Sequence, residues 1–390
     1  MGKSKQKYDR EEILWDYRIA NESRQASLIG RREVLTGKAK FGIFGDGKEV
    51  AQLAMAKVFK NGDWRSGYYR DQTFMMAAGI FSLEEFFAQL YGDTDKDYNP
   101  GTVGRLMNNH FATRYINDDG TWMEQTQMKN SSADISPTAG QMPRLLGLAY
   151  ASYFYRNNPD LKQFGEFSVN GNEVAFGTIG DSSTSEGVFW ETMNAAGLLQ
   201  VPLAMSIWDD GYGISVPREY QTIKGSISEA LAGFEQSGKT PGFKIYKVKG
   251  WDYPALCKTY EEGIKLCREK HVPVIFHVTE LTQPQGHSTS GSHERYKSAE
   301  RLKWENEFDG IRKMREWIIS EKLATAEELD AIEKESAKAA KAARKKAWNH
   351  FMEPLHKKRE DFLKMVDIST CNCSKTTKIA ALKEDLAKVA

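Results

Sequence analysis

The sequence predicts an α/β protein with a doubly wound parallel sheet, helices on both faces of that sheet, and helical extensions at both ends of the chain. The main observation is that short apolar runs alternate with segments of helical length between residues 174 and 278. Such runs are typical of strands buried on both faces, and the long connections between them favour parallel pairing. The strands are expected at 174–179, 203–207, 243–248 and 272–278.

The region before these strands is expected to be helical and then irregular. Helix formers at 8–60, with Ile13, Tyr17 and Ala20 at helical spacing, predict amphipathic helices. Residues 61–135 are aromatic, rich in glycine and irregular in pattern. A buried helix is expected at 141–155, and its apolar face comprises Leu145, Leu146, Ala149 and Tyr153.

The chain after the last strand is helical and heavily charged, a pattern that usually marks a solvated helix surface. A polar stretch at 367–377 predicts a linker before a short terminal helix. We therefore expect four regions: an N-terminal helical region (1–60), an α/β domain (61–298), a C-terminal helical region (299–366), and a linker with a terminal segment (367–390).

The composition argues against several classes of partner. Charged residues make up 27% of the chain and the formal net charge is +1, so no nucleic-acid-binding surface is indicated. No apolar run reaches the ~18 residues that span a bilayer, and the first residues lack the apolar stretch of a secretion signal. We expect a soluble cytoplasmic protein without a membrane partner.

The chain has four cysteines, and their spacing fits neither a metal site nor a disulfide framework. Reduced thiols are therefore expected at Cys257, Cys267, Cys371 and Cys373.

The turn after the first predicted strand has the residues that a phosphate site needs. It reads Gly-Asp-Ser-Ser-Thr-Ser-Glu-Gly at 180–187 and leads into a helix. Small residues let the backbone approach a phosphate, and amides at a helix start favour its negative charge. The Asp181 carboxylate would repel a diphosphate unless a divalent cation lay between them. The turn therefore predicts a diphosphate bridged by a metal ion.

The next strand end supplies a second acidic pair, Asp209 and Asp210. Magnesium prefers six oxygen ligands, commonly one or two carboxylates with phosphate oxygens and water. Taken singly, Asp181 or Asp210 is more often a helix cap or a turn residue. Because ligands bind beyond the carboxyl ends of parallel strands, Asp181 and Asp210 are expected to meet across one ion.

These two turns resemble a known family. Thiamine diphosphate enzymes have Gly-Asp-Gly followed by Asn-Asn, which is similar to residues 180–182 followed by 209–210. The match to the alpha subunits of 2-oxo acid dehydrogenases is closer. Their run Gly-Asp-Gly-Ala-Thr-Ser-Glu-Gly is similar to 180–187, and their Asn-Asn-X-Tyr-X-Ile-Ser to 209–215. The resemblance extends from about residue 10 to residue 360 and implies the thiamine diphosphate-binding fold.

The resemblance also implies a set of site residues. The Asp181 and Asp210 side chains and the Tyr212 carbonyl would bind Mg²⁺, while Tyr69 and Arg70 would hold the diphosphate. An arginine fork suits phosphate oxygens. The segment around residues 136–138 would meet the aminopyrimidine ring through its backbone. The expected cofactor-binding residues are Tyr69, Arg70, Ser136, Thr138, Gly180, Asp181, Ser182, Ser183, Asp210 and His287.

The loop Gly-His-Ser-Thr-Ser at 286–290 resembles a His-Ser-Thr-Ser loop of the same family. The resemblance makes His287 the candidate catalytic residue, because a side chain that titrates near neutrality could pass protons at the reacting centre. From the residues alone, a surface-loop histidine is the more common outcome. Ser288 matches a serine that is phosphorylated in animal members, where a phosphate would repel the cofactor diphosphate.

The sequence departs from the family pattern at Ser182, which replaces a glycine, at Asp209 and Asp210, which replace asparagines, and at Gln283, which replaces a diphosphate-binding arginine of the branched-chain enzymes. The extra charge of Asp210 would repel a diphosphate, and we expect only a bound cation to offset it. We therefore expect this protein to depend on magnesium more strictly than the family members that carry asparagine at this position. A second Gly-Asp-Gly, at 45–47, lacks a metal-binding partner downstream and is expected to form a turn before a helix.

The resemblance implies an oxidoreductase of the acyl-transferring, lipoyl-dependent class: the alpha subunit of a 2-oxo acid dehydrogenase for branched-chain acids. It would use thiamine diphosphate and Mg²⁺ and pass the acyl unit to a lipoyl-bearing acyltransferase core. A beta subunit would complete the site with an activating glutamate, either as a separate chain of a heterotetramer or as a fused half after Ala390. The alpha chain alone should be inactive. The alternatives are a pyruvate or acetoin dehydrogenase alpha subunit, and a scaffold for the beta chain that binds no cofactor.

Overall fold

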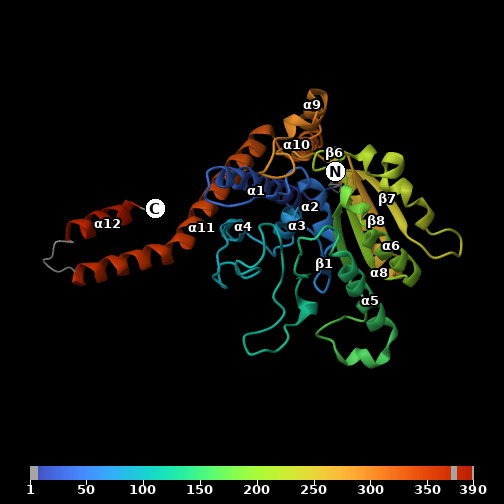
Figure 1. Cartoon of the computed structure of the whole chain (residues 1–390). Coiled ribbons are helices and arrows are strands. Elements are labelled where there is room, and N and C mark those ends of the chain that lie inside the picture. The colour runs from blue at the N-terminus through green and yellow to red at the C-terminus, as the bar shows by residue number, and fades with distance from the viewer. Residues whose placement is uncertain (1–7, 370–375, 389–390) are drawn as a thin grey trace, which may run out of the picture.

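The computed structural model describes residues 8–369 and 376–388. Its centre is a parallel sheet of six strands in the order β2-β1-β3-β4-β8-β7 (Figure 1). These strands are β1 (Trp64–Ser66), β2 (Asn130–Ser131), β3 (Ala175–Gly180), β4 (Leu203–Trp208), β7 (Lys244–Lys249) and β8 (Val274–Thr279). The four longer strands lie where the apolar runs predicted strands, so the expected α/β fold with a parallel sheet is confirmed.

Helices cover both faces of the sheet. They are α2 (Glu49–Val58) and α8 (Tyr253–Lys270) on one face, and α5 (Met142–Asn157) and α6 (Gly187–Leu199) on the other. Phe176 of β3 packs in the first core, while its neighbour Ala175 packs in the second, because successive strand residues point to opposite faces. Every residue of β4 and of β8 is buried, which explains why these strands are mostly apolar in the sequence.

The region 61–135, expected to be irregular, contains regular elements that the sequence analysis missed. They are β1, β2, α3 (Gln72–Ala77) and α4 (Leu83–Tyr91). Strands of two or three residues are too short to show a period-two pattern. In α4 the signal was present, because Ser82 and Glu85 form a capping box at its start and Gly92 ends it in the left-handed conformation. Strand β1 matters for the site because it leads directly to Tyr69 and Arg70.

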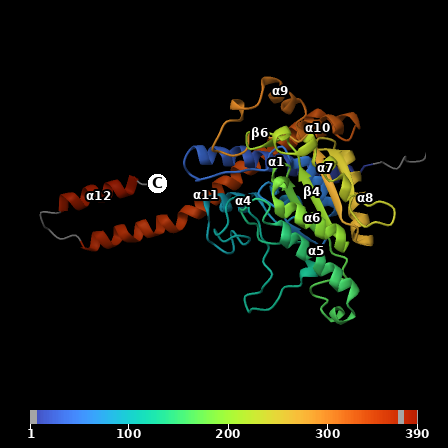
Figure 2. The same ribbon diagram turned by 45° about the vertical axis from the view of Figure 1, so that its right-hand side comes forward.

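Helices from the first and the last parts of the chain pack together beside the sheet (Figures 1 and 2). The helices there are α1 (Arg10–Leu35), α9 (Ala299–Glu307), α10 (Gly310–Ser320) and α11 (Ala326–Ser369). Ala340, Ala343 and Ala347 of α11 are buried with α1 and α4, whereas Leu355 and Phe362 farther along α11 are about half exposed. The second half of α11 extends away from the sheet in both views.

The structure describes only the two ends of the polar stretch 367–377, which the sequence predicted as a linker. Helix α11 continues to Ser369, and α12 (Thr376–Lys388) begins within the same stretch. Cys371 and Cys373 lie outside the described residues, while Cys257 and Cys267 are free thiols. Of the helices in the described parts of the chain, none is both long and apolar enough to cross a membrane. Besides several 3-10 helices, the remaining short elements are α7 (Ile227–Ala230) and an antiparallel pair formed by β5 (Tyr212–Gly213) and β6 (Val216–Pro217).

Candidate active site

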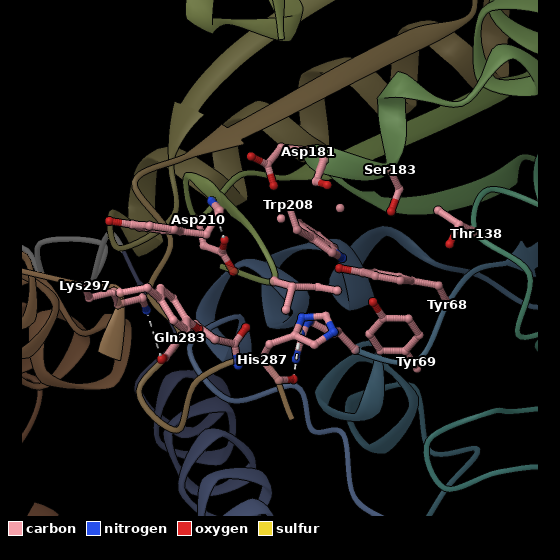
Figure 3. Close-up of a pocket in the computed structure, with 17 residues that line it drawn as sticks. Tyr68, Tyr69, Thr138, Asp181, Ser183, Trp208, Asp210, Gln283, His287 and Lys297 are labelled. Carbon is pink, nitrogen blue, oxygen red and sulfur yellow. Dashed lines mark hydrogen bonds between the residues drawn. The ribbon is translucent and has the colours of Figure 1, made fainter. Parts of the chain in front are cut away.

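A cavity of about 210 Å³ lies at the carboxyl edge of the sheet, where ligands of such folds bind (Figure 3). Loops that follow β1, β3, β4 and β8 contribute to its wall. Asp181 and Ser183 lie on one side of the cavity, and Tyr69 and His287 lie on the opposite side. The predicted site residues in its lining are Tyr69, Arg70, Thr138, Gly180, Asp181, Ser182, Ser183, Asp210, Tyr212 and His287.

Ser136 is the one predicted site residue that does not line this cavity. Its side chain is exposed, and its hydroxyl lies 3.2 Å from Nε2 of His110. The sequence could place the 136–138 loop near the cavity, as Thr138 shows, but it could not predict which way the Ser136 side chain points.

The turn after β3 is tied to the end of β4. The chain passes from Asp181 through the 3-10 helix η3 (Ser182–Ser185) into α6. The Asp181 N–H donates to the Trp208 carbonyl at 3.1 Å, and the Thr184 N–H donates to the Asp181 carbonyl at 3.2 Å. Neither η3 nor α6 has a side-chain hydrogen bond that caps its start. Amides at an uncapped helix start favour an anion.

Asp181 is a buried carboxylate without a compensating cation. Burial, together with the neighbouring carboxylates of Asp209 and Asp210, raises the pKa of Asp181 well above its ordinary value. Within the part of the chain that the structure describes, Asp181 forms no ion pair. A buried carboxylate of this kind is costly unless it gains a positive partner, and a metal ion is one such partner.

Asp210 has the compensation that Asp181 lacks. Lys48 Nζ lies 2.6 Å from Oδ2 of Asp210, and the Tyr212 N–H donates to Oδ1 at 3.2 Å. Burial alone would raise the pKa of Asp210, but the charges of Lys48 and Arg70 outweigh it and hold that pKa below its ordinary value. The premise that only a bound cation can offset this carboxylate is therefore wrong, because the chain supplies an ammonium group of its own.

The Asp209 side chain makes its hydrogen bonds outside the cavity. Its Oδ2 accepts hydrogen bonds from Arg218 Nη1 at 2.6 Å and lies 2.9 Å from His277 Nε2, while Oδ1 accepts from the Gly211 N–H at 3.0 Å. Asp209 is 1% exposed and does not line the cavity. Of the two aspartates that replace asparagines, only Asp210 can therefore reach a bound ligand directly.

Arg70 carries the positive charge on the other side of the cavity. One terminal nitrogen, Nη1, donates to the Phe44 carbonyl at 2.6 Å, and Nη2 contacts both Nδ1 and the carbonyl oxygen of His287 at 3.0 Å. The guanidinium also lies 5.3 Å from the centre of the Tyr69 ring. Arg70 is 4% exposed, and no carboxylate pairs with it among the described residues.

His287 is held as a neutral imidazole. Burial and the nearby charge of Arg70 lower its pKa from 6.5 to about 4. Arginine can only donate, so Nδ1 accepts from Arg70 and the ring proton belongs on Nε2. The expectation that His287 titrates near neutrality is wrong for the protein in this state, because the sequence pattern showed neither its burial nor its arginine neighbour.

Seven residues of the cavity lining were not predicted as site residues: Tyr68, Trp208, Gly213, Ile214, Gln283, Tyr296 and Lys297. Lys297 Nζ pairs with Glu305 of α9 at 2.7 Å, and it lies 5.4 Å from the centre of the Tyr212 ring. A neighbouring residue, Arg301 of α9, donates to the Asp210 carbonyl at 2.7 Å. The charged helix α9 thus supports the Asp210 loop, although a charged run on a helix ordinarily indicates a solvated surface.

The arrangement suits a divalent cation bound to a diphosphate. The buried carboxyl group of Asp181 and the buried guanidinium of Arg70 line the same cavity, and neither forms an ion pair with a described residue. A cation on the carboxylate side and an anion on the guanidinium side would satisfy both. No three His, Cys, Asp or Glu side chains among the described residues form a complete metal shell, so backbone and phosphate oxygens would have to contribute ligands.

The lowered pKa of His287 gives a prediction about acid stability. The unfolded chain takes up this proton near pH 6.5 and the folded chain only near pH 4, so His287 reduces the free energy of unfolding as the pH falls through that window. We expect His287→Asn to lose less stability than the wild type between these pH values. Urea unfolding at a series of pH values measures the difference. A difference between the two proteins that does not change with pH would contradict the assignment.

Residues 24–355 match the family model described as dehydrogenase E1 component. The chain is 24% identical over 330 residues to the mitochondrial 2-oxoisovalerate dehydrogenase subunit alpha of Mus musculus, covering 84% of this chain and 65% of that protein. It is 26% identical over 286 residues to 2-oxoisovalerate dehydrogenase subunit alpha 2 of Arabidopsis thaliana, covering 73% of this chain and 52% of that protein.

A bacterial relative is similar to the same degree. The pyruvate dehydrogenase E1 component subunit alpha of Rickettsia prowazekii is 26% identical over 303 residues, covering 76% of this chain and 78% of that protein. The chain spans between about half and two thirds of the length of the 2-oxoisovalerate relatives. Because the family match covers far more than half of the sequence, the chain belongs to the dehydrogenase E1 component family.

Proposed function

We propose that this chain is the alpha subunit of a 2-oxo acid dehydrogenase and that its cavity binds thiamine diphosphate with Mg²⁺. The family depends on thiamine diphosphate, usually with Mg²⁺. The observation that carries the proposal is that a buried carboxyl group, Asp181, and a buried guanidinium, Arg70, line one cavity at the carboxyl edge of the sheet, and that neither forms an ion pair with a described residue. A scaffold that binds no cofactor would have no reason to keep two such groups desolvated.

Each side of the cavity would hold one part of the cofactor. Asp181, Asp210 and the Tyr212 carbonyl would hold the metal ion. Arg70 and Tyr69 would hold the diphosphate, together with the amides at the start of η3. Residues 136–138, of which Thr138 lines the cavity, would lie against the aminopyrimidine ring.

The remaining roles concern protons and water. When bound, the cofactor supplies a carbon that can attack a keto group and stabilise the charge left when carbon dioxide departs. His287, kept neutral by burial and by Arg70, presents its Nε2 proton as a donor to an anion. The buried rings of Tyr68 and Trp208 in the cavity wall exclude water from the diphosphate end.

We further propose a branched-chain 2-oxo acid as the substrate, a beta subunit that completes the site, and a lipoyl-bearing acyltransferase as the acceptor. Several relatives that carry the 2-oxoisovalerate name support the first part. Exposed large side chains in the segment 214–223 support the second, because Ile214, Val216, Tyr220 and Ile223 are between 44% and 78% exposed and Ile214 also lines the cavity. The pyruvate dehydrogenase relative keeps pyruvate as the second candidate substrate.

Asp181→Asn tests the cofactor assignment. The substitution keeps the shape of the side chain but removes the charge that the metal needs, so we expect thiamine diphosphate binding at fixed Mg²⁺ to weaken by more than about tenfold. Binding can be followed by quenching of tryptophan fluorescence, since Trp208 lines the cavity. Asp252→Asn, the same change at the start of α8, is the matched control and should bind like the wild type. A wild-type protein that does not bind the cofactor, with its native beta chain present, would overturn the proposal.

The substrate assignment has its own test. The chain combined with its native beta chain should decarboxylate branched-chain 2-oxo acids with a higher kcat/KM than pyruvate, measured with an artificial electron acceptor. A higher kcat/KM for pyruvate would instead assign the protein to the pyruvate enzymes. The chain assayed alone should be inactive with every 2-oxo acid.

A further inference from the structure

Lys48 is a buried ammonium group at the back of the cavity wall. It is 1% exposed and does not line the cavity. Its Nζ donates to Asp210 Oδ2 at 2.6 Å, to Gln283 Oε1 at 2.6 Å and to the Thr282 carbonyl at 2.7 Å. All three N–H bonds of the ammonium are therefore used. Two of these partners, Asp210 and Gln283, do line the cavity.

The Gly-Asp-Gly turn at 45–47 places this lysine. Gly47 has a φ of +87°, and a Cβ there would lie 2.0 Å from the Thr282 carbonyl oxygen. A Cβ on Gly45 would lie 2.3 Å from the Arg70 carbonyl oxygen. The turn thus runs in contact with both the Arg70 loop and the 282–283 segment. Asp46 adds a further tie, because its Oδ2 accepts from the Gln285 N–H at 3.0 Å.

The charges of Lys48 and Asp210 depend on each other. Burial lowers the pKa of Lys48, and the charge of Asp210 opposes that effect. A buried ion that loses its partner is strongly destabilised, so removing either charge leaves the other uncompensated. As a pair, the two side chains carry no net charge, which is also true of the asparagine that the family pattern has at position 210.

We propose that Lys48 is a positioning residue of the cofactor site: its ammonium group cancels the charge of Asp210 and fixes Gln283, so that the end of the cavity lined by Asp210 accepts a diphosphate. This inference rests on the proposed function. The role goes beyond a structural ion pair because both side chains that Lys48 holds, Asp210 and Gln283, line the cavity while Lys48 itself does not. Without the ammonium, Asp210 would present an uncompensated carboxylate to an anionic ligand.

A double-mutant cycle on the full chain with its native beta chain tests this role. The four proteins are the wild type, Lys48→Gln, Asp210→Asn and the double variant. Thiamine diphosphate is titrated by tryptophan fluorescence at low and at saturating Mg²⁺. At low Mg²⁺ we expect Lys48→Gln to weaken thiamine diphosphate binding by about tenfold or more, because the Asp210 carboxylate then repels the diphosphate. At saturating Mg²⁺ we expect the loss of affinity to be smaller.

The decisive result is rescue. Adding Asp210→Asn to Lys48→Gln removes the uncompensated charge and should return the affinity to within about threefold of the wild type. If Lys48→Gln alone does not fold, recovery of folded, cofactor-binding protein in the double variant is the same result. Effects of the two substitutions that simply add, or a double variant that fails as the single one does, would overturn the inference.

Lys57→Gln is the matched control. Lys57 pairs with buried Asp16 at 2.8 Å, away from the cavity, so this variant also loses a buried ion pair. It should lower the thermal unfolding temperature without changing how binding depends on Mg²⁺. If both lysine variants changed the Mg²⁺ dependence of thiamine diphosphate binding equally, Lys48 would have only a structural role. A wild-type protein that binds no thiamine diphosphate would instead refute the proposed function itself, so the two failures are distinguishable.

Discussion

A buried carboxyl group, Asp181, and a buried guanidinium, Arg70, line one cavity, and neither forms an ion pair with a residue in the part of the chain that the structure describes. Desolvating a charge costs several kcal/mol unless a partner compensates it. A fold that holds both groups in place, from the ends of different strands, is therefore arranged for a ligand that carries both signs. A metal ion bound to a diphosphate is such a ligand, and family membership makes thiamine diphosphate the natural choice.

The other charges around the cavity are already neutralised, which makes the two exceptions informative. Arg218 pairs with Asp209, Lys48 with Asp210, and Lys297 with Glu305. Arg301 of α9 adds a hydrogen bond to the Asp210 carbonyl, so the C-terminal helical region supports the same loop. The site thus draws on segments from both ends of the chain, held around the edge of one parallel sheet.

Much of the fold and part of this site could be predicted because they follow local rules. Buried parallel strands are mostly apolar, which located β3, β4 and β8, and the apolar residues of the edge strand β7 located that strand although its lysines are exposed. The carboxyl ends of parallel strands must lie at one edge, which brought Asp181 and Asp210 to one cavity. Strands β1 and β2 were missed because they have only three and two residues. Lys48 was missed because its partner Asp210 lies 162 positions away, and no local pattern reports a contact of that kind. The pKa of His287 was misjudged for the same reason, since its burial and its contact with Arg70 are tertiary features.

The most direct measurement of the central claim is an experimental structure of the chain with its beta partner, thiamine diphosphate and Mg²⁺. The account predicts one metal ion between the carboxylates of Asp181 and Asp210, with the Tyr212 carbonyl as a further ligand and the diphosphate within hydrogen-bonding distance of Arg70. An ion bound elsewhere, carboxylates that face away from each other, or a cavity that stays empty at saturating cofactor would contradict it.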